Sequence, residues 1–146
     1  MITYSDTTII MLDDDEREVL LTQQLIKRSG IVNRFVSENS AGKLSATLDN
    51  LVAQGYDPEG FMLLLDINMP DMNGFDVLQE IRNNPKYKNI TVIMLSSSDD
   101  AADILESMEV GSDGYLVKPF NGVEFFAAVE NLPNVGKQLV QQPRAS

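Results

Sequence analysis

The stretch that decides the fold is FMLLLDINMPDMNG, Phe61–Gly74. An unbroken apolar run ends directly in an acidic residue, Asp66, and a proline and a glycine follow at short range. So short a run predicts a strand buried on both faces, as in a parallel sheet that is covered by helices. Asp66 then lies at the carboxyl edge of that sheet, where ligands bind in open α/β folds.

The rest of the chain alternates in the same way between short apolar runs and longer amphipathic ones. Further strands are predicted at 8–12, 31–37, 90–95 and 114–118, and helices at 16–28, 40–54, 74–82, 101–108 and 121–132. This alternation predicts an α/β fold with a doubly wound, five-stranded parallel sheet and right-handed crossovers. We expect the strand order 2-1-3-4-5 of flavodoxin-like (βα)5 domains. Residues 6–132 are expected to form this domain, and 133–146 a C-terminal tail.

The composition restricts the chemistry that the chain can perform. Its 146 residues include no cysteine and no histidine, which excludes a disulfide framework, a thiolate metal site and a histidine base. Any metal is therefore expected to be a hard cation bound by oxygen atoms. The net charge of −11 argues against nucleic acid or an anionic membrane as partner. The N-terminus has no signal-peptide or membrane-span pattern, so a cytoplasmic location is expected.

Several polar residues follow the predicted strands at the switch point of the sheet. In the order 2-1-3-4-5, the strand ends bring together Asp13, Asp14, Asp66, Ser96 and Lys118. Each has an ordinary structural explanation by itself: acidic residues suit a helix start, an aspartate suits a turn, and a serine suits a loop. Together, however, they place three carboxylates, a hydroxyl and one ammonium in a single pocket.

Such a pocket favours phosphoryl chemistry. Crowded carboxylates repel one another and need positive charge beside them. Mg²⁺ accepts one or two carboxylates, several waters and a phosphate oxygen. An aspartate next to such a cation can act as a nucleophile toward phosphorus and form an acyl phosphate, while the lysine neutralises charge on the transferred group.

Four segments together resemble the receiver domain of two-component response regulators. They are the acidic pair after the first strand, DINMPDMNG around Asp66, the pair Ser96-Ser97, and YLVKPF at 115–120. The resemblance extends from Thr7 to Leu132 and keeps the order and spacing of the family's motifs. The small tail is similar to that of stand-alone receivers. The resemblance implies that Asp66 is the phosphoacceptor.

The resemblance also implies roles for the neighbouring residues. Asp14 would bind Mg²⁺ directly, Asp13 would hold a coordinating water, and the backbone carbonyl of Asn68 would add a further ligand. Ser96, at the switch position, and Lys118 would both engage phosphoryl oxygens.

Four more residues match structural or switching positions of the family. Tyr115 matches the aromatic residue that changes rotamer on activation. The Lys118–Pro119 peptide bond is expected to be cis. Pro70 and Gly74 would shape the loop that follows the acceptor.

The implied function is that of a single-domain response regulator. It would take a phosphoryl group from a histidine kinase or histidine phosphotransfer protein, catalyse only its own phosphorylation and dephosphorylation, and signal to a target protein. The signal would be carried by the face formed by the fourth helix, fifth strand and fifth helix, and a homodimer through that face is left open. One alternative is a phosphohydrolase of the haloacid dehalogenase type, but Asn68 stands where that family has an acid/base aspartate. The other is a receiver-like scaffold that is never phosphorylated, against which the complete acidic set, Lys118 and Ser96 argue.

Overall fold

The structure is a computed structural model of the chain, and it describes residues 7–31, 33–70, 72–97, 101–130 and 132. The tail predicted at 133–146 lies outside the described residues. No helix in the described ranges combines the length and the apolar character that crossing a membrane requires.

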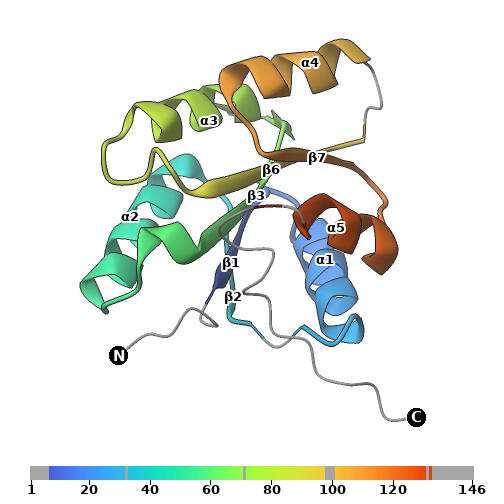
Figure 1. Cartoon of the computed structure of the whole chain (residues 1–146), viewed down its shortest axis with the longest axis horizontal. Coiled ribbons are helices and arrows are strands. Elements are labelled where there is room, and N and C mark those ends of the chain that lie inside the picture. The colour runs from blue at the N-terminus through green and yellow to red at the C-terminus, as the bar shows by residue number, and fades with distance from the viewer. Residues whose placement is uncertain (1–6, 32, 71, 98–100, 131, 133–146) are drawn as a thin grey trace.

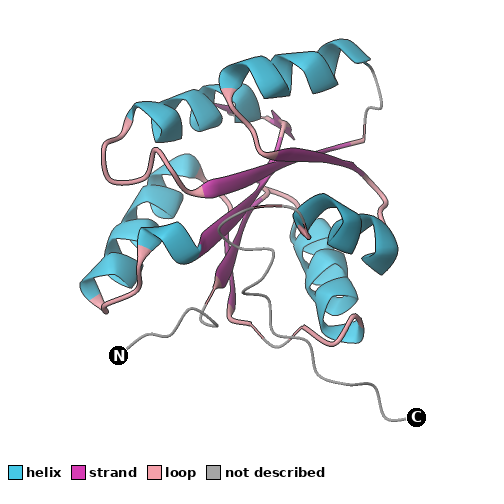
Figure 2. Cartoon of the chain, viewed as in Figure 1, coloured by secondary structure: helices cyan, strands magenta, loops and turns pink. Residues whose placement is uncertain are grey.

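Within the described ranges, five strands form one parallel sheet in the spatial order β2-β1-β3-β6-β7. Their bounds are β1 (Thr8–Leu12), β2 (Phe35–Glu38), β3 (Phe61–Asp66), β6 (Thr91–Ser96) and β7 (Gly114–Val117). Counted among these five alone, the order is 2-1-3-4-5, which confirms the predicted topology. The highly twisted sheet runs through the middle of the molecule in Figure 2.

The last helix ends at Val129 rather than at 132, and two larger differences from the predicted elements lie earlier in the chain. Residues 68–69 and 72–73, which the sequence leaves in a loop, form a small antiparallel pair of strands, β4 (Asn68–Met69) and β5 (Met72–Asn73). The second strand of the large sheet begins at Phe35 rather than at 31, because Ile31 forms only an isolated bridge. The Asn33 side-chain amide instead donates to the carbonyl of Thr7, at 3.0 Å.

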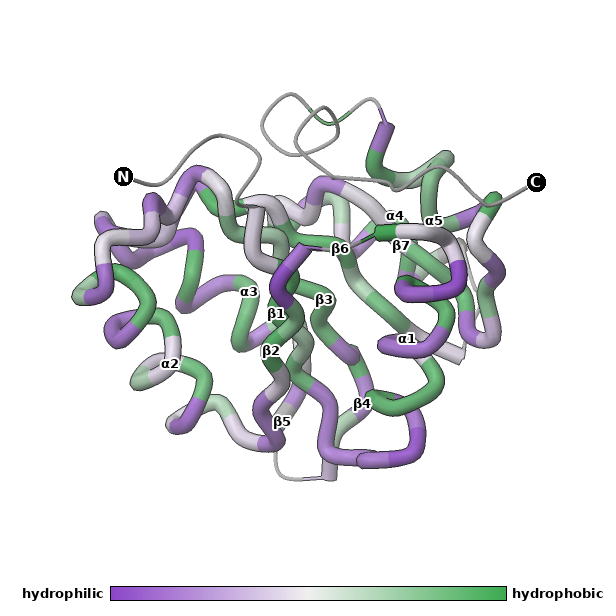
Figure 3. Tube along the Cα trace, turned by 90° about the horizontal axis from the view of Figure 1, so that it is seen from below, coloured by the Kyte–Doolittle hydropathy of each residue, from purple (hydrophilic) through white to green (hydrophobic). Residues whose placement is uncertain are grey.

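Among the residues that the structure describes, five helices cover the sheet, and a short 3-10 helix precedes β3. They are α1 (Glu16–Arg28), α2 (Ala41–Ala53), α3 (Gly74–Asn83), α4 (Ala101–Val110) and α5 (Gly122–Val129), with η1 at Pro58–Gly60. Side-chain caps start the helices where the sequence predicts: Ser40 accepts from the N–H of Lys43, and Asn121 from that of Glu124. Helices α1, α2 and α3 alternate between green and purple in Figure 3, as amphipathic helices do.

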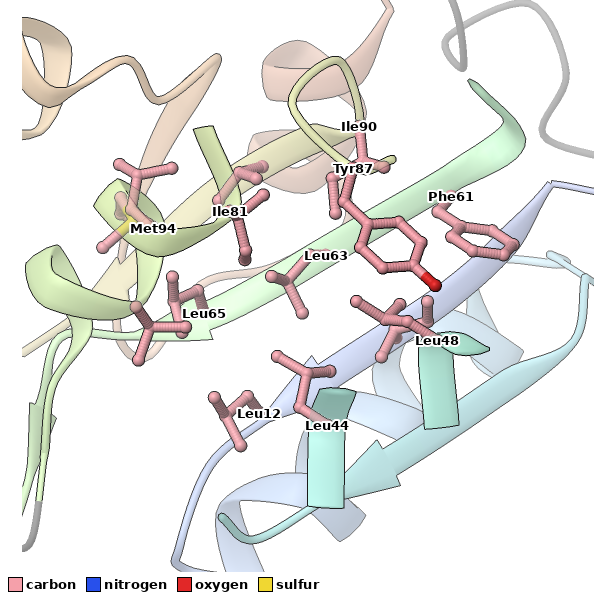
Figure 4. Packing of buried hydrophobic residues seen from close by; sticks show 14 of the residues in the cluster. Leu12, Leu44, Leu48, Phe61, Leu63, Leu65, Ile81, Tyr87, Ile90 and Met94 are labelled. Carbon is pink, nitrogen blue, oxygen red and sulfur yellow. The ribbon is translucent and has the colours of Figure 1, made fainter. Parts of the chain in front are cut away.

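The core has two parts, one on each face of the sheet. Leu44, Leu48 and Leu51 of α2, together with Leu78 and Ile81 of α3, pack on one face. Figure 4 shows the side chains of this part packed next to β3 and Tyr87. The other part packs α1 and α5 against the opposite face, and α5 lies beside α1 in Figure 1. With both faces covered, β1, β3 and β6 are buried along their whole length, and polar side chains collect at their ends.

Candidate functional site

The predicted acidic residues meet at the carboxyl edge of the sheet. Asp13 directly follows β1, and Asp66 ends the neighbouring strand β3. One carboxylate oxygen each of Asp13, Asp14 and Asp66 lies within 4.8 Å of the others. Asp13 and Asp66 are 2% and 5% exposed, whereas Asp14 is exposed. Two buried carboxylates and one at the surface thus form a compact set of hard oxygen donors.

Lys118 closes this cluster from the end of β7. Its Nζ donates to Oδ2 of Asp13 at 3.0 Å and forms an ion pair with Oδ1 of Asp66 at 3.4 Å. The other oxygen of Asp13, Oδ1, accepts the backbone N–H of Asp15 at 2.9 Å. The Lys118–Pro119 peptide bond is cis, the isomer that the family resemblance implies. One ammonium therefore faces three carboxylates.

Burial and the neighbouring charges together shift two pKa values. Burial raises the pKa of the Asp66 carboxyl above its ordinary value, and the negative charge of Asp13 adds to the rise, although the Lys118 ammonium and the N–H of Asn68 oppose it. Burial by itself lowers the pKa of Lys118. Its contacts with Asp13 and Asp66 outweigh burial, so the pKa of Lys118 is raised. The raised pKa keeps the lysine charged, and burial disfavours the ionised form of the Asp66 carboxyl.

The residues that follow Asp66 bring Ser96 into the site. The backbone N–H of Asn68 donates to Oδ1 of Asp66 at 3.4 Å, and the side-chain amide of Asn68 donates to Oγ of Ser96, also at 3.4 Å. Ser96 ends β6 and is fully buried. Tyr115 lies on the next strand, opposite Met94, and packs partly buried against the core beneath α2 and α3. The structure thus connects the Ser96 hydroxyl to Asp66 through Asn68, and it places Tyr115 on the neighbouring strand.

Gly74 permits the close approach of α3 to the end of β3. A Cβ atom at this position would lie 2.4 Å from the carbonyl oxygen of Asp66 and 2.7 Å from Cα of Ile67, which no side chain allows. The N–H of Gly74 donates to the carbonyl of Ile67 at 2.9 Å. The structure gives this predicted loop residue a specific reason to be glycine, whereas Pro70 lines the cleft above.

The carboxylates lie at the bottom of an open cleft of about 1500 Å³. Sequence reasoning missed several of its lining residues, namely Glu18, Leu21 and Leu25 of α1, Asp76 and Glu80 of α3, and Phe120. Asp76 and Glu80 are one turn apart, and such a pair in a sequence reads only as a solvated helix face. The cleft combines an acidic rim with an apolar wall from α1 and Phe120. Because the cleft is open, a reacting group on the surface of another protein can reach the carboxylates.

Comparison with known proteins shows the family of this chain. The model of the response regulator receiver domain family matches residues 9–130. Response regulator Rcp1 of Synechocystis is 28% identical over 94% of this chain and 93% of its own length.

Solved structures of response regulators are also similar to this chain. The bacteriophytochrome response regulator AtBRR superposes with a TM-score of 0.75 at 27% identity, over 88% of this chain and 93% of that one. The Mn²⁺-bound form of Rcp1 gives a TM-score of 0.67 at 25% identity, over 94% and 99% of the two chains.

Proposed function

Because this chain belongs to the response regulator receiver domain family, we propose that it accepts a phosphoryl group on Asp66 and signals in that form. The observation that carries the proposal is the contact of one buried carboxylate, Asp66, with both an acidic pair and the ammonium of Lys118. The phosphoryl donor is a histidine kinase or a histidine phosphotransfer protein, as the family relationship suggests. We assign the domain to residues 6–132 and expect it to act in the cytoplasm, where such donors present their phosphohistidine.

The donor set fits Mg²⁺. Asp14 and Asp66 offer carboxylate oxygens, the backbone carbonyl of Asn68 is proposed as a further ligand, and Asp13 holds a water in the shell. Carboxylate and carbonyl oxygens are the ligands that Mg²⁺ prefers, and the excess negative charge favours a divalent cation. The Mn²⁺-bound structure of Rcp1 supports a metal in a related protein. When bound, the cation supplies positive charge to the phosphoryl oxygens.

Asp66 and Lys118 have different roles in the proposed phosphoryl transfer. A carboxylate oxygen of Asp66 forms a bond to phosphorus, the P–N bond of the phosphohistidine breaks, and its electron pair leaves with the imidazole. Lys118 gives up part of its contact with Asp66 and pairs with a phosphoryl oxygen, since its raised pKa keeps it charged. The product is an acyl phosphate on Asp66. The catalysis that we propose is limited to the chain's own phosphorylation and dephosphorylation, in keeping with relatives that are named response regulators.

The direct test of the acceptor is phosphorylation of Asp66→Asn. Incubation of wild type with acetyl phosphate and Mg²⁺ should add one phosphoryl mass, and Asp66→Asn should add none. The matched control is Asp76→Asn, because Asp76 lines the same cleft without touching the cluster, and it should be phosphorylated normally. One phosphoryl mass on Asp66→Asn at another carboxylate would show that the acceptor is misassigned. Steady release of phosphate without modification would favour the phosphohydrolase alternative.

The proposed switch links Ser96 to Tyr115. The new phosphoryl oxygens attract the hydroxyl of Ser96, which then exchanges its long contact with Asn68 for a shorter one. The space that Ser96 leaves allows the Tyr115 ring to turn inward, and this reshapes the face formed by α4, β7 and α5.

Removing the hydroxyl tests this switch. Ser96→Ala should still accept beryllofluoride, a phosphoryl analogue, at Asp66 but should show a much smaller NMR response around Tyr115 and α5 than wild type. Ser97→Ala is the control, since Ser97 lines the cleft at the next position. Equal shift changes in wild type and Ser96→Ala would contradict the coupling.

A further inference from the structure

A second cavity, of about 350 Å³, lies at the amino edge of the sheet. Its lining comes from segments that each precede a strand, namely Glu59 of η1 before β3, Lys88 and Asn89 in the loop before β6, and Asp113 before β7. Because the strands are parallel, residues that precede them share one edge of the sheet, and the carboxylates of the cleft lie at the other edge. The cavity is therefore separate from the site of the proposed phosphoryl transfer.

The ion pair of Arg82 with Asp113, at 3.0 Å, lines this cavity and keeps one donor and one acceptor unused. Arg82 makes four hydrogen bonds, three to backbone carbonyls and one to Asp113, and a guanidinium has five N–H groups. The remaining N–H, on Nη2, has no protein acceptor within the described ranges. Oδ2 of Asp113 accepts from Arg82 and from the N–H of Val92, whereas Oδ1 has no protein donor in the same ranges.

Three exposed polar side chains also line the cavity. They are the ammonium of Lys88, the amide of Asn89 and the carboxylate of Glu59. In the part of the chain that the structure describes, none of the three forms an ion pair or a side-chain hydrogen bond. With Arg82 and Asp113, the lining has two cations and two carboxylates, so its charge is balanced.

Balanced charge favours a small ligand that carries both signs. A simple anion meets the two carboxylates and a simple cation meets the ammonium and the guanidinium, so neither gains much from this lining. A zwitterion pairs with all four groups at once. The volume of about 350 Å³ is at the small end of the range for ligand sites. Of the described residues that line the cavity, only Ile90 has a large apolar side chain, so a bulky apolar group on the ligand would gain little by burial.

We propose that this cavity binds a free α-amino acid with a small side chain, of which glycine is the simplest. The carboxylate of the amino acid accepts hydrogen bonds from Lys88 and from the unused N–H of Arg82. Its ammonium donates to Oδ1 of Asp113 and to the carboxylate of Glu59. The inference goes beyond the proposed function and does not require it, because no residue lines both the cavity and the acidic cleft.

Glycine and its two blocked forms test this chemistry directly. In unmodified, Mg²⁺-free protein, glycine should shift the amide NMR signals of Lys88, Asn89 and Asp113 and should saturate. Its Kd should be on the order of 1 mM, because charge pairs at an exposed surface are weak. N-acetylglycine lacks the ammonium and glycinamide lacks the carboxylate, so each should bind about tenfold more weakly than glycine. Binding of glycine should also weaken with rising salt.

Matched variants locate the contact. Lys88→Met and Glu59→Gln should each weaken glycine binding about fivefold, whereas Lys88→Arg keeps the cation and should bind as wild type. The controls are Lys86→Met, in the same loop but outside the cavity, and Glu80→Gln, in the acidic cleft, and both should bind as wild type. Equal losses in variants and controls, shifts confined to the acidic cleft, or no saturable shift would overturn the proposal. Equal binding of glycine and N-acetylglycine would show an anion site instead, and equal binding of glycinamide a cation site.

The result is independent of phosphotransfer. If Asp66 takes no phosphoryl group but glycine shifts the signals around Lys88 and Asp113, the proposed function fails and this inference stands. If Asp66 is phosphorylated and glycine shifts no signal at the cavity, the inference fails and the proposed function stands.

Discussion

In the described part of the chain, Arg82 and Lys118 each form a cluster with at least one carboxylate, and the two clusters are built in opposite ways. Arg82 donates to three backbone carbonyls, those of Lys88, Ile90 and Gly111, at 2.7 to 3.0 Å, and pairs with Asp113 at 3.0 Å. Lys118, by contrast, has two carboxylates within ion-pair distance and a third close by.

The two clusters differ in the balance between positive and negative charge. The planar guanidinium of Arg82 distributes its N–H groups over acceptors in fixed directions, and its single charge meets a single carboxylate, whose Oδ2 also accepts the N–H of Val92. Such a cluster holds α3, β6 and the end of α4 together. The Lys118 cluster has more negative than positive charge, so folding alone does not complete it. A site of this kind is expected where a cation and a phosphoryl group are to be bound.

The largest effect is expected from breaking the balanced cluster. Arg82→Met should lower the free energy of unfolding by about 2–3 kcal/mol, because three carbonyls and one carboxylate lose their donors. Urea denaturation measures this loss. Lys88→Met is the control and should change stability by less than about 0.5 kcal/mol, since its side chain is exposed and only its backbone contacts Arg82. A cost for Arg82→Met as small as that of the control would contradict the structural role.

The two clusters also differ in how far the sequence reveals them. Asp13, Asp66 and Lys118 each follow an apolar run, so local patterns and the strand order suffice to bring them together. Arg82 near the end of an amphipathic helix looks like an ordinary C-terminal basic residue. Its partners are mostly backbone carbonyls, 6, 8 and 29 residues away in the sequence, and no sequence pattern marks a carbonyl as an acceptor.

The same reasoning explains the other differences from prediction. Strands of two residues, such as β4 and β5, are too short to show alternation, so the pair after Asp66 was not predictable. The apolar wall of the cleft was missed because Leu21 and Leu25 fit the ordinary pattern of an amphipathic helix. Only the packing of α1 beside Phe120 assigns them to the site.

The second prediction compares how much Mg²⁺ stabilises variants of the two clusters. At about a hundredfold excess over its Kd, Mg²⁺ should stabilise the protein by about 2.7 kcal/mol through mass action. Thermal unfolding with increasing Mg²⁺ measures this gain. Asp14→Asn should lose most of it because an exposed member of the donor set is gone. Arg82→Met is less stable than wild type, but Mg²⁺ should raise its free energy of unfolding by as much as it does in wild type. Equal melting temperatures of wild type with and without Mg²⁺ would contradict the metal site.

The smallest expected effect concerns the charge of Asp66 in the metal-free protein. The pKa of Asp66 is higher in the folded protein than its value near 3.8 in the unfolded chain. At pH values between these two pKa values, the native state therefore binds more protons than the unfolded chain. Stability therefore falls as pH rises through this window, and the ionised carboxylate is a cost to the fold above it. Asp66→Asn removes that cost and should be more stable than wild type at neutral pH. The gain should not exceed about 1 kcal/mol, because Lys118 offsets part of the repulsion.

Three measurements decide this last prediction. Urea denaturation in chelator should show the gain of Asp66→Asn at pH 7 and its disappearance as pH falls below the window, where wild type is protonated as well. Saturating Mg²⁺ should reverse the order, since the variant lacks a ligand. Asp113→Asn is the counterpart in the balanced cluster and should lose stability at pH 7, because Asp113 is the single carboxylate paired with Arg82. If Asp66→Asn and Asp113→Asn both destabilise the metal-free protein to the same extent, the contrast between the two clusters is wrong.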